Sequence, residues 1–263
     1  MLNNKNTANR LENSAKEQNR PQPEPDVTVV TVCFNAENTI LPTLQSVIAQ
    51  KGVRKEYIIV DGASTDSTID IVNRFHDEID IIVSEPDNGI YDAMNKGVRL
   101  AGGRYIIFMN AADRFASEDT LAKLIARAQK DATVVYGDVI KPAADGGEKV
   151  KKAEPPHNGH RMFFCHQSAM TERVALLAHP FDTSHRLSAD FKLFKQLIKE
   201  GAVFQQVDFP VAKFDTGGIS NVKRSEGLKD NLRVLRETDS FLTRLRLAPR
   251  LWIPMILCRL RGK

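Results

Sequence analysis

Acidic and amide side chains follow four apolar runs in the first half of the chain, a pattern that could build a cation-binding site. Each run is short and rich in β-branched residues, which is typical of a buried strand. The carboxyl ends of parallel strands meet at one edge of a sheet, and ligands bind there. The residues at these ends are Asn35 and Glu37, Asp61, Glu85 and Asp87, and Asn110 and Asp113. We therefore expect them to lie near one another.

Each of these residues taken alone also has an ordinary structural explanation. Asp61-Gly62 is a common turn pair, Asp66 is a common helix cap, and Asp113 suits a loop or a cap. Their joint placement at successive strand ends is what favours a site.

The sequence excludes two common ways of holding a diphosphate. No GxGxxG follows the first predicted strand, and GxxxxGK[ST] is absent from the chain, so neither a dinucleotide fingerprint nor a phosphate-binding loop is supported. Carboxylates at strand ends can instead hold a hard divalent cation, which bridges the phosphate oxygens. The pattern favours a metal-bridged nucleotide and no redox cofactor.

The elements that must position these residues alternate between strand and helix. The helix patterns repeat their apolar residues every three or four positions. The expected strands cover residues 27–34, 57–60, 79–83, 105–109 and 133–136. Alternation with short links predicts the α/β class, with a mostly parallel central sheet and helices on both faces.

The alternation ends after Gly137. Residues 140–160 are polar and contain Pro and Gly, which indicates a hairpin or a flexible loop. The elements expected beyond them are a helix beginning near Leu187, a strand at 203–207, a turn at Gly217-Gly218 and one long helix from about Arg224 to Pro249.

The composition of the 263-residue chain is that of an ordinary globular protein, with 42% apolar and 27% charged residues. Residues 1–26 are polar without apolar periodicity, and we expect a disordered leader. No secretory signal is visible, and no run reaches the roughly 18 apolar residues of a spanning helix. The three cysteines form no CxxC pair and suit a reducing compartment. We therefore expect a cytoplasmic protein.

Basic residues are concentrated in the tail. Residues 223–263 hold 11 Lys and Arg against 4 Asp and Glu. A nucleic-acid binder would carry basic residues throughout its body, so no nucleic-acid partner is expected. Pro249 and Pro254 should divide the apolar run of the tail into short pieces.

The last 23 residues have the character of an interfacial membrane anchor. Trp252 suits a headgroup boundary. One helical face would carry Ile253, Ile256, Leu257 and Leu260. We expect residues 241–263 to lie on an anionic membrane surface, at the inner face of the cell membrane. The alternative is a terminal helix that packs on the body or on a second subunit.

Several motifs, in order, resemble family 2 glycosyltransferases, and the bacterial subgroup of exopolysaccharide, colanic-acid and O-antigen assembly in particular. The motifs are VTVVTVCFNAENT, EYIIVDGASTDST, SEPDNGIYDAMNKG, YIIFMNAADRF, FFCHQSAM and LSADFKLFKQLIKEG. The resemblance implies a GT-A fold over residues 27–222, with a nucleotide-sugar half (27–137), an acceptor half (138–222) and a basic helical tail (223–263). It also implies inverting transfer from a nucleotide-diphosphate sugar to a saccharide on a polyprenyl diphosphate.

The resemblance assigns nucleotide and donor binding by position. The residues carried over are Asn35, Asp61, Ser64, Asp66, Asn95 and Lys96. Asp61 would hydrogen-bond the base or the ribose, and Ser64 would help to shape that loop. Many members carry Arg where this chain has Met94, so positive charge at the phosphates is expected from Lys96 or from a metal ion.

The metal motif of the family is usually a DxD-type acidic cluster, and this chain reads Asn110-Ala111-Ala112-Asp113 there. The resemblance makes Asp113 the ligand of Mg²⁺ or Mn²⁺ and Asn110 a donor-sugar contact. Hard cations prefer several oxygen ligands, so a single carboxylate leaves the metal affinity open. His166, followed by Gln167, could complete the coordination or contact the acceptor or the diphosphate. A catalytically degenerate nucleotide-binding scaffold is the alternative function.

Asp190 matches the acidic position that the family uses as its base. Inverting displacement needs one carboxylate to take the proton of the acceptor hydroxyl. The structural alternative is that Ser188 caps a helix and Asp190 is only a favourable charge in its first turn, worth about 0.3–1 kcal/mol.

Overall fold

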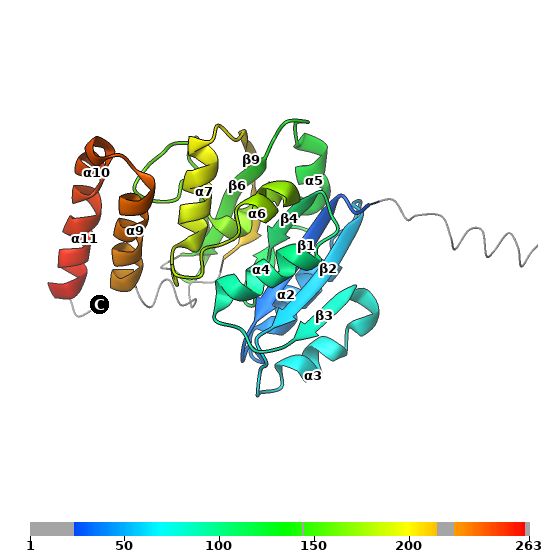
Figure 1. The fold of residues 1–263 in the computed structure, drawn as a ribbon. Helices are drawn as coiled ribbons and strands as arrows, with labels where there is room; N and C mark the ends of the chain where they lie inside the picture. The colour runs from blue at the N-terminus through cyan, green and yellow to red at the C-terminus, as the bar shows by residue number, and fades with distance from the viewer. Residues whose placement is uncertain (1–23, 144, 215–223, 261–263) are drawn as a thin grey trace, which may run out of the picture.

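The sheet begins with four strands close to those predicted. The computed structural model describes residues 24–143, 145–214 and 224–260. The strands are β1 (Val27–Cys33), β2 (Lys55–Asp61), β3 (Ile81–Ser84) and β4 (Tyr105–Phe108). They are parallel and lie in the order β3-β2-β1-β4 (Figure 1). Their carboxyl ends therefore share one edge.

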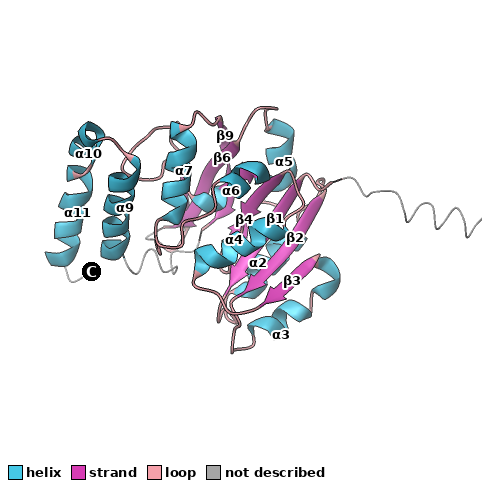
Figure 2. Ribbon diagram, viewed as in Figure 1, coloured by secondary structure: helices cyan, strands magenta, loops and turns pink. Residues whose placement is uncertain are grey.

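Helices cover both faces of this sheet, as predicted (Figure 2). One face carries α2 (Ile40–Ile48), α3 (Thr68–Asn73) and α5 (Thr120–Arg127), and the other carries α4 (Ile90–Leu100), α6 (Arg173–Ala178) and α7 (Ala189–Lys199). Strand β1 is buried along its whole length and supplies both cores, because Val27 and Val29 face one and Val30 faces the other. A short 3-10 helix, His76–Glu78, precedes β3.

The second half of the sheet is mixed, which the sequence did not predict. Its strands are β5 (Arg114–Phe115), β6 (Val134–Pro142), β7 (Glu148–Lys151), β8 (Ala169–Glu172) and β9 (Phe204–Lys213). The order across the described chain is β3-β2-β1-β4-β8-β6-β9-β5, with β7 beside β6. β8 runs antiparallel to both β4 and β6. Parallel neighbours need a long crossover connection, usually through an α-helix, and in the described residues no α-helix separates β6 from β8.

The prediction of one long C-terminal helix was wrong. Three helices are present: α9 (Arg224–Thr238), α10 (Phe241–Leu247) and α11 (Pro249–Leu260). The Ser240 hydroxyl accepts from the Thr243 N–H and so begins α10. Pro249 is the first residue of α11, where a missing N–H costs nothing. Pro254 lies inside α11 and does not end it, contrary to expectation.

The three C-terminal helices pack against the body through α7 (Figure 1). A separate apolar cluster joins Phe191 of α7 to residues of all three helices, among them Leu232, Leu247 and Leu251. Among the helices of the described ranges, none combines the length and the hydropathy that crossing a bilayer requires. The expected leader at residues 1–26 lies almost wholly outside the described residues, and the expected turn at Gly217-Gly218 lies outside them entirely.

Helix α4 approaches β1 closely at Gly97, and this contact gives a stability prediction. A methyl group on Gly97 would lie 2.4 Å from Val30 Cγ1 and 3.2 Å from Val30 Cγ2, so the buried valine would have to shift. We expect Gly97→Ala to lower the free energy of unfolding by about 1–3 kcal/mol through overpacking. Gly227→Ala, inside α9 with open space around it, should instead stabilise by up to about 1 kcal/mol. Denaturant unfolding measures both, and equal effects of the two would contradict this packing.

Candidate active site

The turn after β4 places Asn110 and Asp113 side by side in a buried position. The Asp113 N–H donates to the Asn110 carbonyl at 2.9 Å, and Ala112 has a positive φ of 83°. Thr43 of α2 donates to the Asp113 carbonyl at 2.8 Å and fixes the turn against that helix. Both side chains are more than nine-tenths buried. The turn therefore holds an amide and a carboxylate rigidly at the strand-end edge.

A short 3-10 helix, His166–Ser168, brings two more side chains to this turn just before β8. Gln167 Nε2 donates to Asp113 Oδ2 at 2.9 Å. Cys165 Sγ lies 2.9 Å from Gln167 Oε1, and burial raises the pKa of this thiol to about 12. The protonated thiol is therefore a donor that orients the Gln167 amide toward Asp113.

Asp190, in the first turn of α7, is joined to the same group of residues through His166. Asp190 Oδ2 lies 3.5 Å from His166 Nδ1. Asp190 Oδ1 accepts from the Tyr91 hydroxyl at 2.9 Å and from the Phe191 N–H at 2.8 Å. Burial, reinforced by the charge of Asp190, holds the pKa of Tyr91 well above its ordinary value, so this phenol keeps its proton and donates. The carboxylate is thus held in one orientation.

The protonation of His166 follows from its surroundings. Burial lowers the pKa of His166, and the nearby Asp190 charge opposes this only in part, so the neutral ring is favoured. Nδ1 faces a carboxylate, whereas Nε2 lies 3.5 Å from Asn110 Nδ2, which can only donate. The tautomer with hydrogen on Nδ1 satisfies both contacts. Both distances are at the outer limit of a hydrogen bond.

Asn110 Oδ1 is buried and has no hydrogen-bond partner among the residues that the structure describes. An unpaired buried carbonyl oxygen lowers the stability of a protein by about 1–3 kcal/mol. A bound ligand that contacts this atom would remove that cost. Asn110 Oδ1 belongs to the same turn as the Asp113 carboxylate, and oxygen atoms of both kinds are ligands of Mg²⁺ and Mn²⁺. The residues present therefore fit a divalent cation.

The loops after β1 and β2 are tied together by the residues predicted there. The buried Asp61 carboxylate accepts from the Ser64 N–H at 2.9 Å and from the Ser84 hydroxyl at 2.7 Å. Ser64 Oγ accepts from the Asn35 N–H at 2.8 Å, and Asp66 accepts from the Glu37 N–H at 3.1 Å. In this structure the four predicted residues shape one loop cluster, and a direct contact of Asp61 with a base or ribose stays a prediction.

Two predicted residues of α4 are bound to neighbouring loops of the protein. Asn95 is buried and uses both ends of its amide on the backbone of Phe181, at 2.8 and 2.9 Å. Lys96 Nζ donates to the Pro86 carbonyl at 2.8 Å and pairs with Glu85 at 2.9 Å. In this structure one holds the loop that leads to α7 and the other holds the loop between β3 and α4, and a contact of either residue with the nucleotide stays a prediction.

Sequence reasoning missed two residues near Asp113 and Asp190. Tyr91 was visible in the motif GIYDAMNKG, but nothing in its spacing pointed to a partner 99 residues away. Lys141 of β6 stacks its Nζ on the Phe214 ring at 4.3 Å, and burial lowers its pKa. Asp113 and Cys165 are among the groups that act on Lys141 electrostatically. Its amino group is therefore close enough to Asp113 to interact with that carboxylate.

Comparison with known proteins identifies the family. The model of glycosyl transferase family 2 matches residues 28–198, well over half of the chain, so the chain belongs to this family and is a glycosyltransferase. A PGL/p-HBAD biosynthesis glycosyltransferase of Mycobacterium tuberculosis is 29% identical over 252 residues, 90% of each chain. A putative teichuronic acid biosynthesis glycosyltransferase, TuaG, of Bacillus subtilis is 36% identical over 103 residues, 38% of this chain and 40% of its own.

Solved structures show that the fold is of the GT-A type. Residues 1–349 of S. aureus TarS in complex with UDP superpose with a TM-score of 0.61 and 16% identity, covering 82% of this chain and 67% of that one. The mannosyltransferase PcManGT from Pyrobaculum calidifontis, in complex with GDP-Man and Mn²⁺, gives a TM-score of 0.64 and 18% identity, covering 94% and 74%. The predicted family and fold are confirmed.

Proposed function

We propose that this glycosyltransferase moves a sugar from a nucleotide-diphosphate sugar to a saccharide hydroxyl, with inversion and with Asp190 as the base. The observation that supports this most strongly is the contact of His166 with both Asp190 and Asn110, beside the contact of Gln167 with Asp113. These contacts support the proposal because they join Asp190, the proposed base, to the turn that would face the donor.

In the proposed step, Asp190 takes the proton of the acceptor hydroxyl while the hydroxyl oxygen bonds to the anomeric carbon. The bond from that carbon to the diphosphate oxygen breaks, and the nucleoside diphosphate leaves with the electron pair. One displacement from the opposite face inverts the anomeric centre. Tyr91 and His166 hold the Asp190 carboxylate in one orientation. A positioned general base contributes about 10²–10⁴-fold to the rate of a reaction of this kind.

We assign Asp113 and Asn110 Oδ1 as the groups of this chain that hold a Mg²⁺ or Mn²⁺ ion. A bound divalent cation neutralises the charge that develops on a departing diphosphate. Gln167 orients the Asp113 carboxylate for metal binding, as hydrogen-bond partners of metal ligands commonly do.

The acceptor is proposed to be a growing saccharide on a polyprenyl diphosphate, in the synthesis of a surface polysaccharide or glycoconjugate. The names of the two relatives support a biosynthetic role of this kind, because one names PGL/p-HBAD biosynthesis and the other teichuronic acid biosynthesis. A lipid-linked acceptor requires the enzyme to work at a membrane.

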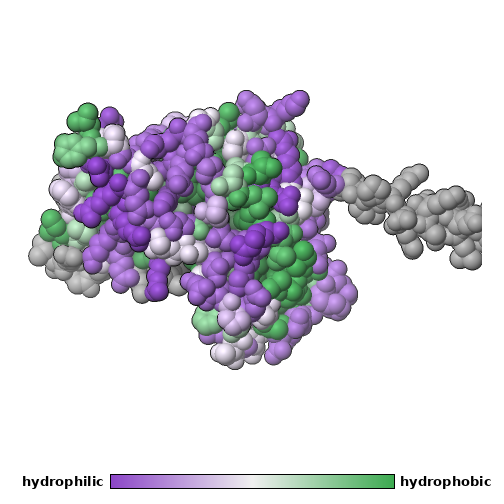
Figure 3. Space-filling view, viewed as in Figure 1, coloured by the Kyte–Doolittle hydropathy of each residue, from purple (hydrophilic) through white to green (hydrophobic). Residues whose placement is uncertain are grey.

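We propose that α10 and α11 bind the membrane surface. Five large apolar side chains on these helices are exposed, by 48–77% of their area: Phe241, Leu242, Leu245, Trp252 and Ile256. Figure 3 shows apolar side chains gathered over α10 at the upper left of the molecule. Arg246 and Arg250 are exposed between them, and each basic residue at an anionic surface contributes about 1 kcal/mol. The face predicted from the sequence also included Ile253, Leu257 and Leu260, whose side chains are not among those that the structure describes.

Substitution of two apolar residues of α10 is expected to weaken membrane binding. Burial of one leucine side chain is worth about 1.5–3 kcal/mol, so Leu242→Ser with Leu245→Ser should lower partition onto phosphatidylglycerol vesicles by about 10-fold or more. Val174→Ser on α6, a comparably exposed apolar residue, is the matched control and should bind like the wild type. Co-sedimentation with the vesicles measures this. Unchanged binding of the double variant would remove α10 as the docking face.

The proposed transfer is tested by incubating the purified protein with UDP-, GDP- and dTDP-sugars and Mn²⁺ and detecting released nucleoside diphosphate. Turnover with one nucleotide class, and an inverted product by NMR, is the expected result. The scaffold alternative is favoured by the single carboxylate of the Asn110–Asp113 turn. Cation-dependent nucleotide binding without turnover on any donor or acceptor would support that alternative.

A further inference from the structure

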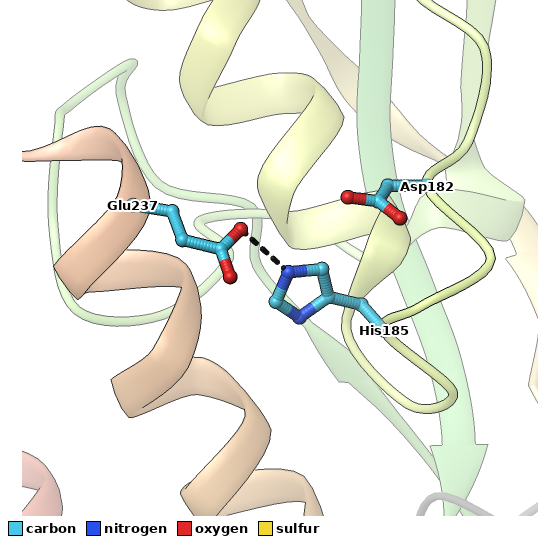
Figure 4. Close-up of side chains that lie close together, drawn as sticks. All are labelled: Asp182, His185 and Glu237. Carbon is cyan, nitrogen blue, oxygen red and sulfur yellow. Dashed lines mark hydrogen bonds and ion pairs between the residues drawn. The ribbon is translucent and has the colours of Figure 1, made fainter.

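An ion-pair cluster joins α9 to the loop that precedes Asp190 (Figure 4). We infer that Asp230, Arg233 and Glu237 of α9 are positioning residues for Asp190, so that a helix outside the family match completes the active site. The inference rests on the proposed role of Asp190 as the base. The family match ends at residue 198, and α9 begins at Arg224.

The cluster has the composition of a metal site but is already neutralised. Ligand atoms of Asp182, His185 and Glu237 lie within 4.8 Å of one another. Lys192 Nζ, however, lies 2.6 Å from Asp182 Oδ2 and 2.6 Å from Glu237 Oε2. The Lys192 ammonium group occupies the position that a metal cation would take. Its hydrogen bond to Glu237, and to a lesser extent the one from His185, lowers the pKa of Glu237 to about 2. We therefore treat the cluster as a structural junction.

His185 is the centre of this junction. Its side chain is fully buried, with Nδ1 2.7 Å from Asp230 Oδ1 and Nε2 2.9 Å from Glu237 Oε2. Each ring nitrogen therefore faces a carboxylate oxygen of α9 at hydrogen-bond distance. Charge-assisted bonds of this kind are about twice as strong as neutral ones.

Further contacts hold the backbone of the same loop to α9. Asp230 Oδ2 accepts from the Leu187 N–H at 3.1 Å. Arg233 donates to the carbonyl and to the hydroxyl of Ser184, both at 3.0 Å. Ser188, directly before α7, donates to the Gly227 carbonyl at 3.4 Å. Four of the five residues from Ser184 to Ser188 are therefore bound to α9.

Helix α7 itself is fastened to the carboxyl end of α9 by three lysines along one face. Lys192 pairs with Glu237, Lys195 makes a fully buried pair with Asp239 at 2.9 Å, and Lys199 donates to the Thr238 carbonyl. Cations at a helix carboxyl terminus also interact favourably with its dipole. These contacts fix α7 and its preceding loop as one unit with α9.

The consequence for Asp190 is geometric. It is the second residue of α7 and follows the clamped loop directly. The other end of the loop is held at Phe181 by Asn95 of α4. Displacement of a reacting group by about 1 Å can cost about 10²-fold in rate, so loosening α9 should misplace the base without touching the donor turn at Asp113.

Asp230→Asn tests this inference, with Arg233→Ala as a milder second variant because Arg233 is half exposed. Amide hydrogen exchange over residues 184–192 should become at least 10-fold faster in Asp230→Asn. With a donor found by the turnover screen, kcat should fall about 10-fold or more, while the Kd for nucleoside diphosphate and Mn²⁺ is unchanged. The control is Glu200→Gln, which removes a His179–Glu200 pair of 2.9 Å at the far end of α7 and should change neither.

A double variant separates this inference from the role of Asp190. If α9 acts through Asp190, adding Asp230→Asn to Asp190→Asn should cost little further activity. Wild-type exchange rates, or an unchanged kcat in Asp230→Asn while Asp190→Asn is inactive, would overturn the positioning role and leave the base in place. Full activity of Asp190→Asn would instead overturn the base, and the hydrogen-exchange result would still decide whether α9 orders the loop.

Discussion

Replacing Asp190 by asparagine should lower the rate of sugar transfer by about 10²–10⁴-fold, the range that a positioned general base supplies. The amide has the size of the carboxylate and can still accept from the Tyr91 hydroxyl and the Phe191 N–H, so the local structure should persist. Because the base lies apart from the donor turn, the affinity for nucleoside diphosphate with Mn²⁺ should stay within about 2-fold of wild type. Steady-state kinetics and calorimetry measure the two effects.

The control for this variant is Asp70→Asn, which removes an exposed carboxylate from the first turn of α3. It tests the structural alternative, in which a first-turn acid contributes only about 0.3–1 kcal/mol through the helix dipole. Both variants would lose that contribution, but only Asp190→Asn should lose transfer. Retained transfer in Asp190→Asn would remove this residue as the base.

Replacing Asp113 by asparagine should abolish the dependence of turnover on Mg²⁺ or Mn²⁺ and lower the rate by about 10²–10³-fold. A cation at the leaving diphosphate is worth several kcal/mol, and the remaining neutral oxygens of the turn are weak substitutes for a carboxylate. The Kd for nucleoside diphosphate measured with Mn²⁺ should rise to the value measured in EDTA. Calorimetry with and without the metal ion makes this comparison.

Asp119→Asn is the matched control for Asp113, because it removes an exposed carboxylate six residues further along the chain. It should keep the full metal dependence. If Asp113→Asn still responds to Mn²⁺ as the wild type does, the cation binds elsewhere and the assignment of the turn is wrong.

The first half of the fold could be predicted because its signals are local. Strand β1 is a continuous run of buried residues, and its start at Val27 coincides with an abrupt change in composition. The mixed half could not be predicted in the same way. β5 has only two residues, and its pairing with β9 joins Arg114 to Lys213, almost a hundred positions away. Such pairings leave no periodic pattern in the sequence.

The part of the candidate site that follows directly from strand ends could be predicted, because that signal is also local. Strand ends placed Asn110 and Asp113 correctly at the shared edge, and the structure brings His166, Gln167 and Asp190 to them. The polar residues of α4 were harder to interpret. The motif position of Asn95 is the same whether its side chain binds a nucleotide or holds a loop. Only the hydrogen bonds to the Phe181 backbone show that its amide is already occupied.

The direct test of the central claim is a crystal structure of the chain soaked with Mn²⁺ and the nucleoside diphosphate that stabilises it most. We expect an anomalous peak at Asp113 and Asn110 Oδ1, with the β-phosphate bound to the same ion on the side that faces Asp190. A metal ion and nucleotide bound away from this turn, with Asp190 remote from the phosphate, would contradict the account.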